Sequence, residues 1–217
     1  MNVLVVGDSC IDTFIYGDIN RISPEAPVPV FNPTHQIDND GMAKNVVRNL
    51  EALGCSVEFV SNDNTIKKIR YVDSRSNQMV IRVDENDKCR SIDKTELKYI
   101  EKWGKTFDAV IISDYCKGFL NENNINFIID KCDNVFLDTK KQIGEWLYGA
   151  DFIKINNLEY KKNFKNEPML ENIKNKLIIT QGKNGCVFKG KKFPTEEVPV
   201  KDVSGAGDTF LSGLVVE

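Results

Sequence analysis

Short apolar runs alternate with helix-like segments over most of the chain. The runs have the length and composition of strands buried in a parallel sheet, and they occupy Val3–Val6, Val57–Val60, Ala109–Ile112, Val135–Leu137, Phe152–Ile155 and Leu177–Thr180. Between them, apolar residues at helical spacing predict helices over 41–53, 93–103 and 122–132. Alternating strands and helices predict an α/β fold, with a mostly parallel sheet covered by helices on both faces.

A second group of strand-like segments does not alternate with helices. The last two of the four flank residues 73–77, a plausible hairpin turn, and the four segments are Thr13–Tyr16, Val28–Phe31, Ile66–Val72 and Met79–Val83. We expect them to form a small antiparallel sheet apart from the main one, with strands from about 13–32 and 66–84.

Local signals mark the ends of several elements. Asp93 and Glu96 have the spacing of a capping box at a helix start. Pro168 can open another helix at its first turn. Residues 186–193 predict a hairpin around Gly190, and a last helix is expected from Ala206 onward.

Composition narrows the class of protein. The chain has 217 residues, 41% of them hydrophobic, and a net charge of −3 without a basic block, so nucleic acid is not an expected partner. It has no apolar run of membrane-spanning length and no signal-peptide pattern, so we expect no membrane association. The six cysteines form no CxxC pair and fit reduced thiols in a cytoplasm. One histidine argues against a His-based triad.

The stretch from Asp202 to Asp208 carries the strongest chemical signal. Gly205 and Gly207 lie where the last helix begins, and Ala206 is its first residue. Helix-start N–H groups lack internal acceptors, and glycine lets an anion approach them closely, so phosphate is the natural ligand. A carboxylate beside phosphate needs a purpose, and deprotonating an acceptor hydroxyl is the obvious one for Asp208. The alternative is a glycine-rich cap in which Asp208 only complements the helix dipole.

Polar residues follow the apolar runs at the edge where parallel strands end. In open parallel sheets, ligands bind beyond these carboxyl ends. Asp8 and Asp12 could therefore accept hydrogen bonds from sugar hydroxyls, although Asp8 could equally be a turn residue. Asn156 and Glu159 follow a later strand, where Glu159 could be a metal-facing group or only a first-turn helix carboxylate.

Several ordered motifs resemble one known family. They include residues 5–8 with Asp12, the string 21–30, GMAKNV at 41–46, KIR at 68–70, SRSNQ at 74–78, SDYCKG at 113–118, Asn156-x-x-Glu159, Thr180-x-Gly182-x-x-Gly185 and residues 202–208. Each is weak alone, but their order is specific. The chain resembles the PfkB, or ribokinase-like, carbohydrate kinases, and within them the heptose 7-phosphate kinases, which also form the N-terminal domain of a bifunctional heptose kinase/adenylyltransferase.

The resemblance implies a fold and a reaction. The fold is a three-layer α/β/α sandwich, a single ribokinase-like kinase domain over residues 1–217, with a β-sheet lid that often mediates homodimerisation. The implied reaction is phosphoryl transfer from ATP, with Mg²⁺, to the anomeric hydroxyl of D-glycero-D-manno-heptose 7-phosphate. The product would be the 1,7-bisphosphate, a precursor on the ADP-heptose route to lipopolysaccharide core.

The resemblance also assigns roles to individual residues. Asp208 becomes the base, and the backbone of Gly205, Ala206 and Gly207 becomes the anion hole. The sugar is assigned to Asp12, Gly41 and Asn45, together with Asp8. Mg²⁺ and its waters are assigned to Asn156 and Glu159. The nucleotide is assigned to Thr180, Gly182, Gly185, Ser204 and the two glycines of the anion hole.

A sugar that already carries a phosphate needs cations away from its reacting end. Arg70, Arg75 and Lys117 are the candidates, since arginine suits bidentate phosphate contacts, and Arg21 is a weaker one. Ordinary solvated surface charge is the alternative for all of them.

The chain departs from the family pattern in three places. Met42 and Lys44 replace small residues of the GGAANV motif, which could change the acceptor or its affinity. Residues 61–66 bridge directly to a lid strand where the family has a helix-containing unit of roughly 25–30 residues. The last helix is followed by none of the family's further helices. Three hypotheses follow: an active heptose-phosphate kinase, a weakly active binding or dimerising relative, or a kinase for another phosphosugar.

Overall fold

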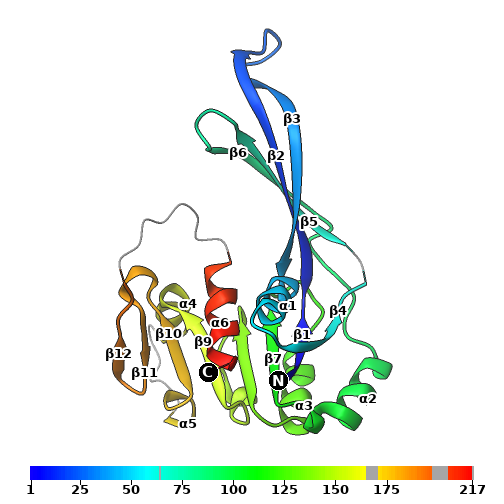
Figure 1. Cartoon of the computed structure of the whole chain (residues 1–217), viewed down its shortest axis with the longest axis vertical. Helices are drawn as coiled ribbons and strands as arrows, with labels where there is room; N and C mark the ends of the chain where they lie inside the picture. The colour runs from blue at the N-terminus through cyan, green and yellow to red at the C-terminus, as the bar shows by residue number, and fades with distance from the viewer. Residues whose placement is uncertain (64, 165–170, 197–204, 217) are drawn as a thin grey trace.

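The main sheet of the computed structural model has eight strands and forms the body of the molecule (Figure 1). The structure describes residues 1–63, 65–164, 171–196 and 205–216. The strand order is β12 (Lys191–Phe193), β11 (Cys186–Phe188), β10 (Leu177–Thr180), β9 (Phe152–Asn156), β8 (Val135–Thr139), β7 (Ala109–Asp114), β1 (Asn2–Gly7) and β4 (Ser56–Ser61). Strands β4, β1, β7, β8, β9 and β10 pair in parallel, while β11 and β12 add an antiparallel edge. The predicted mostly parallel sheet is confirmed.

Helices cover both faces of this sheet, so the predicted three-layer sandwich is also confirmed. On one face, α1 (Ala43–Ala52) and α6 (Ala206–Val216) pack over β1, β7 and β8. On the other face lie α2 (Lys94–Trp103), α3 (Glu122–Lys131), α4 (Asn157–Phe164) and α5 (Glu171–Lys174). Short 3₁₀ turns occupy Gly104–Thr106, Glu145–Leu147 and Gly182–Asn184. Most buried side chains of the sheet are Val, Ile, Leu or Phe, as two covered faces require, and the polar exceptions lie mainly at the carboxyl ends of β7 and β8.

The second sheet rises from the body as a long twisted ribbon, which we call the lid (Figure 1). Its order is β3 (Pro29–Met42), β2 (Ser9–Ile22), β5 (Ile66–Asp73) and β6 (Met79–Glu85). The prediction of a separate small sheet is confirmed, but a wholly antiparallel one is wrong. Strand β2 pairs with β5 in parallel, because the chain returns through α1 and β4 before it enters β5.

The lid strands are also longer than the sequence indicates. Strand β3 continues to Met42, ten residues beyond the expected end at 32. Most of this extension is exposed and polar, and it pairs with β2 on one side only. Such a segment has no buried face, so its composition carries no strand pattern.

Several local predictions are confirmed at the atomic level. Asp93 accepts hydrogen bonds from the backbone of Thr95 and Glu96, and Glu96 accepts one from Asp93, which completes the capping box of α2. A two-residue turn at Lys189–Gly190 joins β11 to β12. The expected helix start at Pro168 lies outside the described residues, although α5 follows it.

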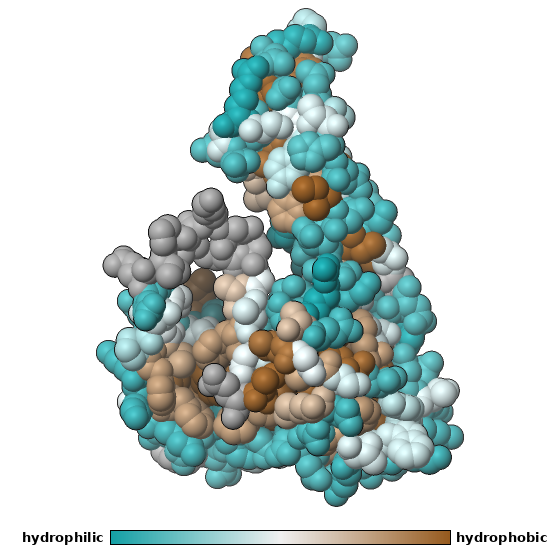
Figure 2. Space-filling view, viewed as in Figure 1, coloured by the Kyte–Doolittle hydropathy of each residue, from teal (hydrophilic) through white to brown (hydrophobic). Residues whose placement is uncertain are grey.

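Surface character differs between the lid and the body. Hydrophobic residues gather over the lower body around α6, while the lid surface is mainly hydrophilic with scattered apolar positions (Figure 2). No helix among the described residues is long and apolar enough to cross a bilayer. Strand β4 ends at Ser61 and β5 begins at Ile66, so the expected short connection is confirmed.

Candidate active site

Asp208 lies in the first turn of α6, where both oxygens of its carboxylate receive a hydrogen bond. Asn45 Nδ2 donates to Oδ2 over 2.8 Å, and the Tyr115 hydroxyl donates to Oδ1 over 2.7 Å. The side chain is only 4% exposed. Burial raises the pKa of Asp208 above its ordinary value, while the two hydrogen bonds act in the opposite direction. The arrangement holds a buried carboxylate in one fixed orientation.

Two glycines shape the loop in front of Asp208. Gly205 has a φ of +76°, a left-handed conformation that glycine adopts without steric cost. A Cβ at this position would also lie 2.8 Å from Asn45 Nδ2. A Cβ on Gly207 would lie 2.9 Å from Lys154 Nζ. Position 205 therefore needs glycine, whereas a side chain at Gly207 would displace the Lys154 ammonium group. Glycines at a helix start let an anion approach its N–H groups. Ser204, predicted to border the nucleotide, lies outside the described residues.

Asp8 lies directly beneath this site, but its carboxylate points into the fold. It is fully buried and accepts hydrogen bonds from the backbone N–H groups of Tyr115, Lys117 and Phe119. Burial raises the pKa of Asp8, and the nearby Asp114 adds to that effect. In this structure Asp8 therefore holds the loop after β7, and its assignment to the sugar stays a prediction.

Asp12 and Gly41 lie at the base of the lid, close to each other. Asp12 forms an ion pair with Arg70, whose Nη1 is 2.7 Å from Oδ1. A Cβ on Gly41 would collide with the Asp12 carboxylate, so glycine is required there. The neighbouring Met42 has φ 57° and ψ −136°, which for a residue with a side chain costs about 1–3 kcal/mol. The family glycine would fit this backbone without strain.

The predicted phosphate-binding cations are not all in one place. Arg70 faces Arg82 directly across β5 and β6, and Lys68 lies on the same face of the lid. Lys117 forms an ion pair with Asp87 over 2.6 Å.

Arg75 is different, because it lies in the turn after β5 and donates to Asn20 near the far end of β2. The eight residues from Asp12 to Asn20 span about 26 Å of strand. Arg21 lies one residue further along the same strand, so both are remote from Asp208.

Asn156 and Glu159 form a reciprocal cap at the start of α4. The Asn156 side chain accepts from the N–H groups of Leu158 and Glu159, and Glu159 Oε2 accepts from the Asn156 N–H over 2.8 Å. The remaining Glu159 oxygen binds Lys140 Nζ over 2.6 Å. This spacing therefore builds a helix start and presents one carboxylate at the carboxyl end of β9.

A buried ion pair lies between this cap and the glycine loop. Lys154 Nζ is 2.6 Å from Asp138 Oδ2, and both residues are less than 5% exposed. Asp138 Oδ1 is buried without a hydrogen-bond partner among the described residues, and Lys140 Nζ is 3.8 Å from it. Burial alone would lower the pKa of Lys140, but Asp138 and Glu159 outweigh it and raise that pKa. Charges of both signs thus meet beneath the start of α6.

Thr180 is the last residue of β10, and Gly182 and Gly185 lie in the turn that follows. Thr180 pairs with Asn156 of the adjacent strand, so this turn lies beside the Asn156–Glu159 cap. Gly182 and Gly185 both have positive φ, at 57° and 80°. A Cβ on Gly182 would meet only open space, whereas one on Gly185 would collide with the Phe193 carbonyl. The turn is therefore open at Gly182 and closed at Gly185.

Four residues of this site received no role from the sequence: Tyr115, Asp138, Lys140 and Lys154. Tyr115 lies within the quoted SDYCKG string, and Asp138 and Lys140 follow the predicted strand Val135–Leu137. Lys154 offered the clearest missed clue, because it is a charged residue inside an apolar strand. Buried charges are rare unless they are paired, so that position pointed to a partner on a neighbouring strand.

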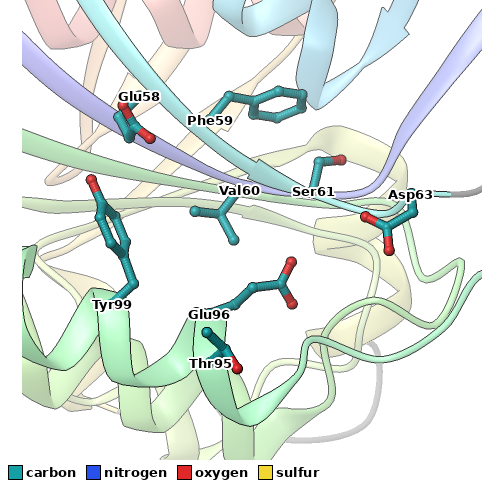
Figure 3. Close-up of a pocket in the computed structure, with 8 residues that line it drawn as sticks. All are labelled: Glu58, Phe59, Val60, Ser61, Asp63, Thr95, Glu96 and Tyr99. Atoms are coloured by element: carbon teal, nitrogen blue, oxygen red, sulfur yellow. The ribbon is translucent and has the colours of Figure 1, made fainter.

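A separate hollow lies between β4 and α2 and contains none of the predicted site residues (Figure 3). In Figure 3 the Tyr99 and Glu58 side chains approach each other across it, and it is lined by Glu58, Phe59, Val60, Ser61, Asp63, Thr95, Glu96 and Tyr99. Arg90 bridges Asp63 and Glu96 at its rim. Within the described part of the chain, no three His, Cys, Asp or Glu side chains cluster closely enough to hold a metal by themselves.

Comparison with known proteins identifies the family of the chain. The sequence profile of the family described as "pfkB family carbohydrate kinase" matches residues 39–217. Among similar proteins, the "Bifunctional protein HldE" of a Nitratiruptor species is 32% identical over 259 residues, covering 98% of this chain and 55% of the relative. The protein of the same description from Vibrio atlanticus is 32% identical over 262 residues, covering 98% and 54%.

The chain spans about half the length of the curated relatives it matches. The first alignment runs over 259 positions although the chain has 217 residues, so that relative has residues within the span that this chain lacks.

Solved structures share the fold. The ribokinase from Thermotoga maritima superposes with a TM-score of 0.68 at 18% identity, covering 99% of this chain and 84% of that one. Phosphofructokinase-2 from Escherichia coli in complex with fructose-6-phosphate gives a TM-score of 0.69 at 15% identity, covering 99% and 85%.

Proposed function

The chain belongs to the pfkB family of carbohydrate kinases, and on that premise we propose that it transfers a phosphoryl group from MgATP to a hydroxyl of a sugar phosphate. The acceptor we propose is the anomeric hydroxyl of D-glycero-D-manno-heptose 7-phosphate. The observation that carries the reaction type is Asp208, a buried carboxylate held by two donors at the open N-terminus of α6. The heptose is supported by the motif strings at 21–30, 68–70 and 113–118.

The acceptor occupies the space between the lid base and Asp208. Asp12 and the Gly41 backbone contact sugar hydroxyls, and Asn45 connects the sugar side of the site to the base. Arg70 and Lys117 provide cations for the phosphate already on the sugar. Arg75 is too far along the lid to share this role within one chain.

The donor lies on the other side of the glycine loop. The turn containing Thr180, Gly182 and Gly185 borders the nucleotide, and the α6 N-terminus receives the transferred phosphoryl group. Lys154 lies directly beneath Gly207, where a cation offsets phosphate charge.

The residues near this loop fit a Mg²⁺ ion held through water. The buried Asp138 Oδ1 without a hydrogen-bond partner and the Glu159 carboxylate both face Lys140, and hard oxygen ligands are what Mg²⁺ prefers. When bound, Mg²⁺ would neutralise charge on the phosphates of the donor.

The chemistry of the chain's own residues follows from these positions. Asp208 accepts the proton of the acceptor hydroxyl, whose oxygen attacks the γ-phosphorus of ATP. The bond from that phosphorus to the β–γ bridging oxygen breaks, and ADP leaves with the bonding electrons. The backbone N–H groups at the start of α6 stabilise the charge on the phosphoryl oxygens in the transition state. Asn45 and Tyr115 keep the carboxylate in place while it gains the proton.

The test is Asp208→Asn, which retains size and polarity but cannot accept a proton. We expect ADP release with the heptose phosphate to fall by at least about 10²-fold, the lower end of a general base's usual contribution. Sugar-phosphate binding, measured by calorimetry, should persist. Asp130→Asn on the exposed end of α3 is the matched control and should leave turnover unchanged. Full turnover in Asp208→Asn would refute the assignment of the base.

A second candidate function is a weakly active sugar-phosphate-binding relative that dimerises through the lid. The strained Met42 at a glycine position favours it on the sugar side. On the dimer side, Ile15, Tyr71 and Ile81 form an apolar row across three lid strands, and Ile81 is 55% exposed. A panel of sugar phosphates assayed for ADP release separates the candidates, because this relative binds without turnover and a kinase for another phosphosugar prefers another member.

A further inference from the structure

Tyr115 makes a direct contact with the proposed base. Its hydroxyl donates to Asp208 Oδ1 over 2.7 Å, while Asn45 Nδ2 donates to Oδ2 over 2.8 Å. Each carboxylate oxygen therefore has one fixed donor and keeps a lone pair for another. Two donors on opposite oxygens fix the plane of the carboxylate, which a single donor would leave free to rotate.

Tyr115 is itself held from three directions. Its backbone N–H donates to Asp8 Oδ2 over 2.7 Å, which fixes the start of the loop after β7. Its ring has Lys68 Nζ and Lys140 Nζ each 5.5 Å from the centroid, within the range of cation–π attraction. The ring also packs against the small cluster that contains Met42. Little freedom remains for the hydroxyl to leave Asp208.

These contacts join parts of the chain that are far apart in sequence. Lys68 comes from β5 of the lid, and Lys140 also binds Glu159 at the start of α4. Tyr115 thus stands between the lid, the donor side of the site and the base. A side chain that served only to fill space would not need a buried hydroxyl, since phenylalanine would pack equally well.

The hydroxyl cannot replace Asp208 as the base. Burial and the Asp208 charge raise the pKa of Tyr115 above its ordinary value, so it stays protonated and donates. The other groups around Asp208 are Asp138, which raises the pKa of Asp208, and Lys154 and Asn45, which lower it. Lys140 also lies within electrostatic range. The hydrogen bonds that Asn45 and Tyr115 donate to Asp208 favour the ionised form that a base requires.

We propose that Tyr115 is the positioning residue of the catalytic base: its hydroxyl fixes Asp208 so that the unused lone pairs face the acceptor hydroxyl. This inference rests on the proposed function only in treating Asp208 as the catalytic base. The contact between Tyr115 and Asp208, and its effect on the carboxylate, can be measured without any turnover.

The experiment compares wild type with Tyr115→Phe, which keeps the ring and both lysine contacts. Carboxyl carbons of aspartate are labelled with ¹³C, and the Asp208 signal is assigned as the one lost in Asp208→Asn. We expect Asp208 to titrate at higher pH in Tyr115→Phe, because a donor to the ionised form has been removed. Tyr99→Phe, in the hollow between β4 and α2, is the control and should leave the Asp208 titration unchanged.

A second measurement changes the donor in the opposite direction. Incorporation of 3-fluorotyrosine at position 115 makes the hydroxyl a stronger donor, so the Asp208 titration should move to lower pH. This variant keeps the hydrogen bond and the packing, so it answers the question even if Tyr115→Phe does not fold. An Asp208 titration that is the same with phenylalanine or fluorotyrosine as in wild type would overturn the proposal.

Kinetics then separate this inference from the proposed function. In an active kinase, Tyr115→Phe should lower kcat about tenfold or more on the acid side of the pH profile and much less at high pH, with little change in the KM for MgATP. A uniform loss at all pH values would indicate a merely structural role and would overturn the proposal. If the titration shifts as expected but no sugar phosphate is turned over by wild type, the positioning role stands and the proposed reaction fails.

Discussion

The buried pair between Lys154 and Asp138 allows a sharp prediction about stability. The two charged atoms are 2.6 Å apart, and the side chains are 5% and 3% exposed. Their mutual attraction at that distance is about 6 kcal/mol for an effective dielectric constant of about 20. Most of this is offset by the cost of removing both charges from water. Replacing Lys154 by Met therefore leaves the desolvation cost of Asp138 without its main compensation.

We expect Lys154→Met to lower the free energy of unfolding by about 3 kcal/mol. Loss of one partner of a buried pair usually costs about 3–5 kcal/mol, and the low end applies because Lys140 remains 3.8 Å from Asp138. For a chain of this size, that loss corresponds to a decrease in Tm of about 6–12 °C. Urea unfolding followed by fluorescence of Trp103 and Trp146 measures the free energy, and calorimetry measures Tm.

The double variant Lys154→Met with Asp138→Leu tests the reason for the loss. It removes both charges and fills the space with apolar atoms, so its stability should return to within about 1 kcal/mol of wild type or exceed it. Lys131→Met removes an exposed ion pair with Glu101 and should change stability by less than about 1 kcal/mol. The reasoning fails if Lys154→Met is as stable as the Lys131→Met control, or if the double variant is no more stable than the single one.

Two positions with positive φ, Gly205 and Lys189, give further predictions. Gly205→Ala places a Cβ 2.8 Å from Asn45 Nδ2 at a φ of +76°, so phosphoryl transfer should fall about tenfold or more and the free energy of unfolding by about 1–2 kcal/mol. The control Gly213→Ala has nothing within 4 Å of its Cβ and should not destabilise the protein. Equal behaviour of the two variants in kinase and melting assays would contradict the clash. Lys189→Asn suits the φ of 50° in the β11–β12 turn and should raise stability by about 0.5–1 kcal/mol; a lower Tm would contradict a left-handed turn there.

Features set by neighbouring residues could be predicted from the sequence. The Asp93 capping box and the turn at 189–190 depend on side chains a few positions apart, and both are present. The mostly parallel pairing of the main sheet follows from apolar runs that alternate with helices. Here each local preference agrees with the final fold, so a short window of sequence is sufficient.

Features set by distant residues could only be predicted in part. The sequence placed Asn45 and Asp208 in one site, but nothing in it indicates that they bond to each other. The parallel pairing of β2 with β5 was missed because consecutive strand-like segments without helices favour hairpins. The polar extension of β3 was missed because a two-sided exposed strand needs no apolar alternation.

Asp8 shows how one residue type at a strand end can serve two purposes. Position alone makes a carboxylate after β1 a candidate ligand, and it also makes the same carboxylate an anchor for the neighbouring loop. The three N–H groups that bind it in the second role come from residues 107 to 111 positions later. Only the closure of the loop after β7 brings them to the carboxylate.

The bond between Asn45 and Asp208 has a consequence for how the protein is made. The two residues are 163 positions apart. At about 5–20 residues per second, a ribosome needs roughly 8–33 s to reach Asp208 after Asn45. During that time α1 and the lid base can fold on β1 and β4, but the Asn45 amide cannot yet donate to the Asp208 carboxylate. The pocket for the sugar can therefore take shape before the proton acceptor, which follows Asn45 by 163 residues, has been synthesised.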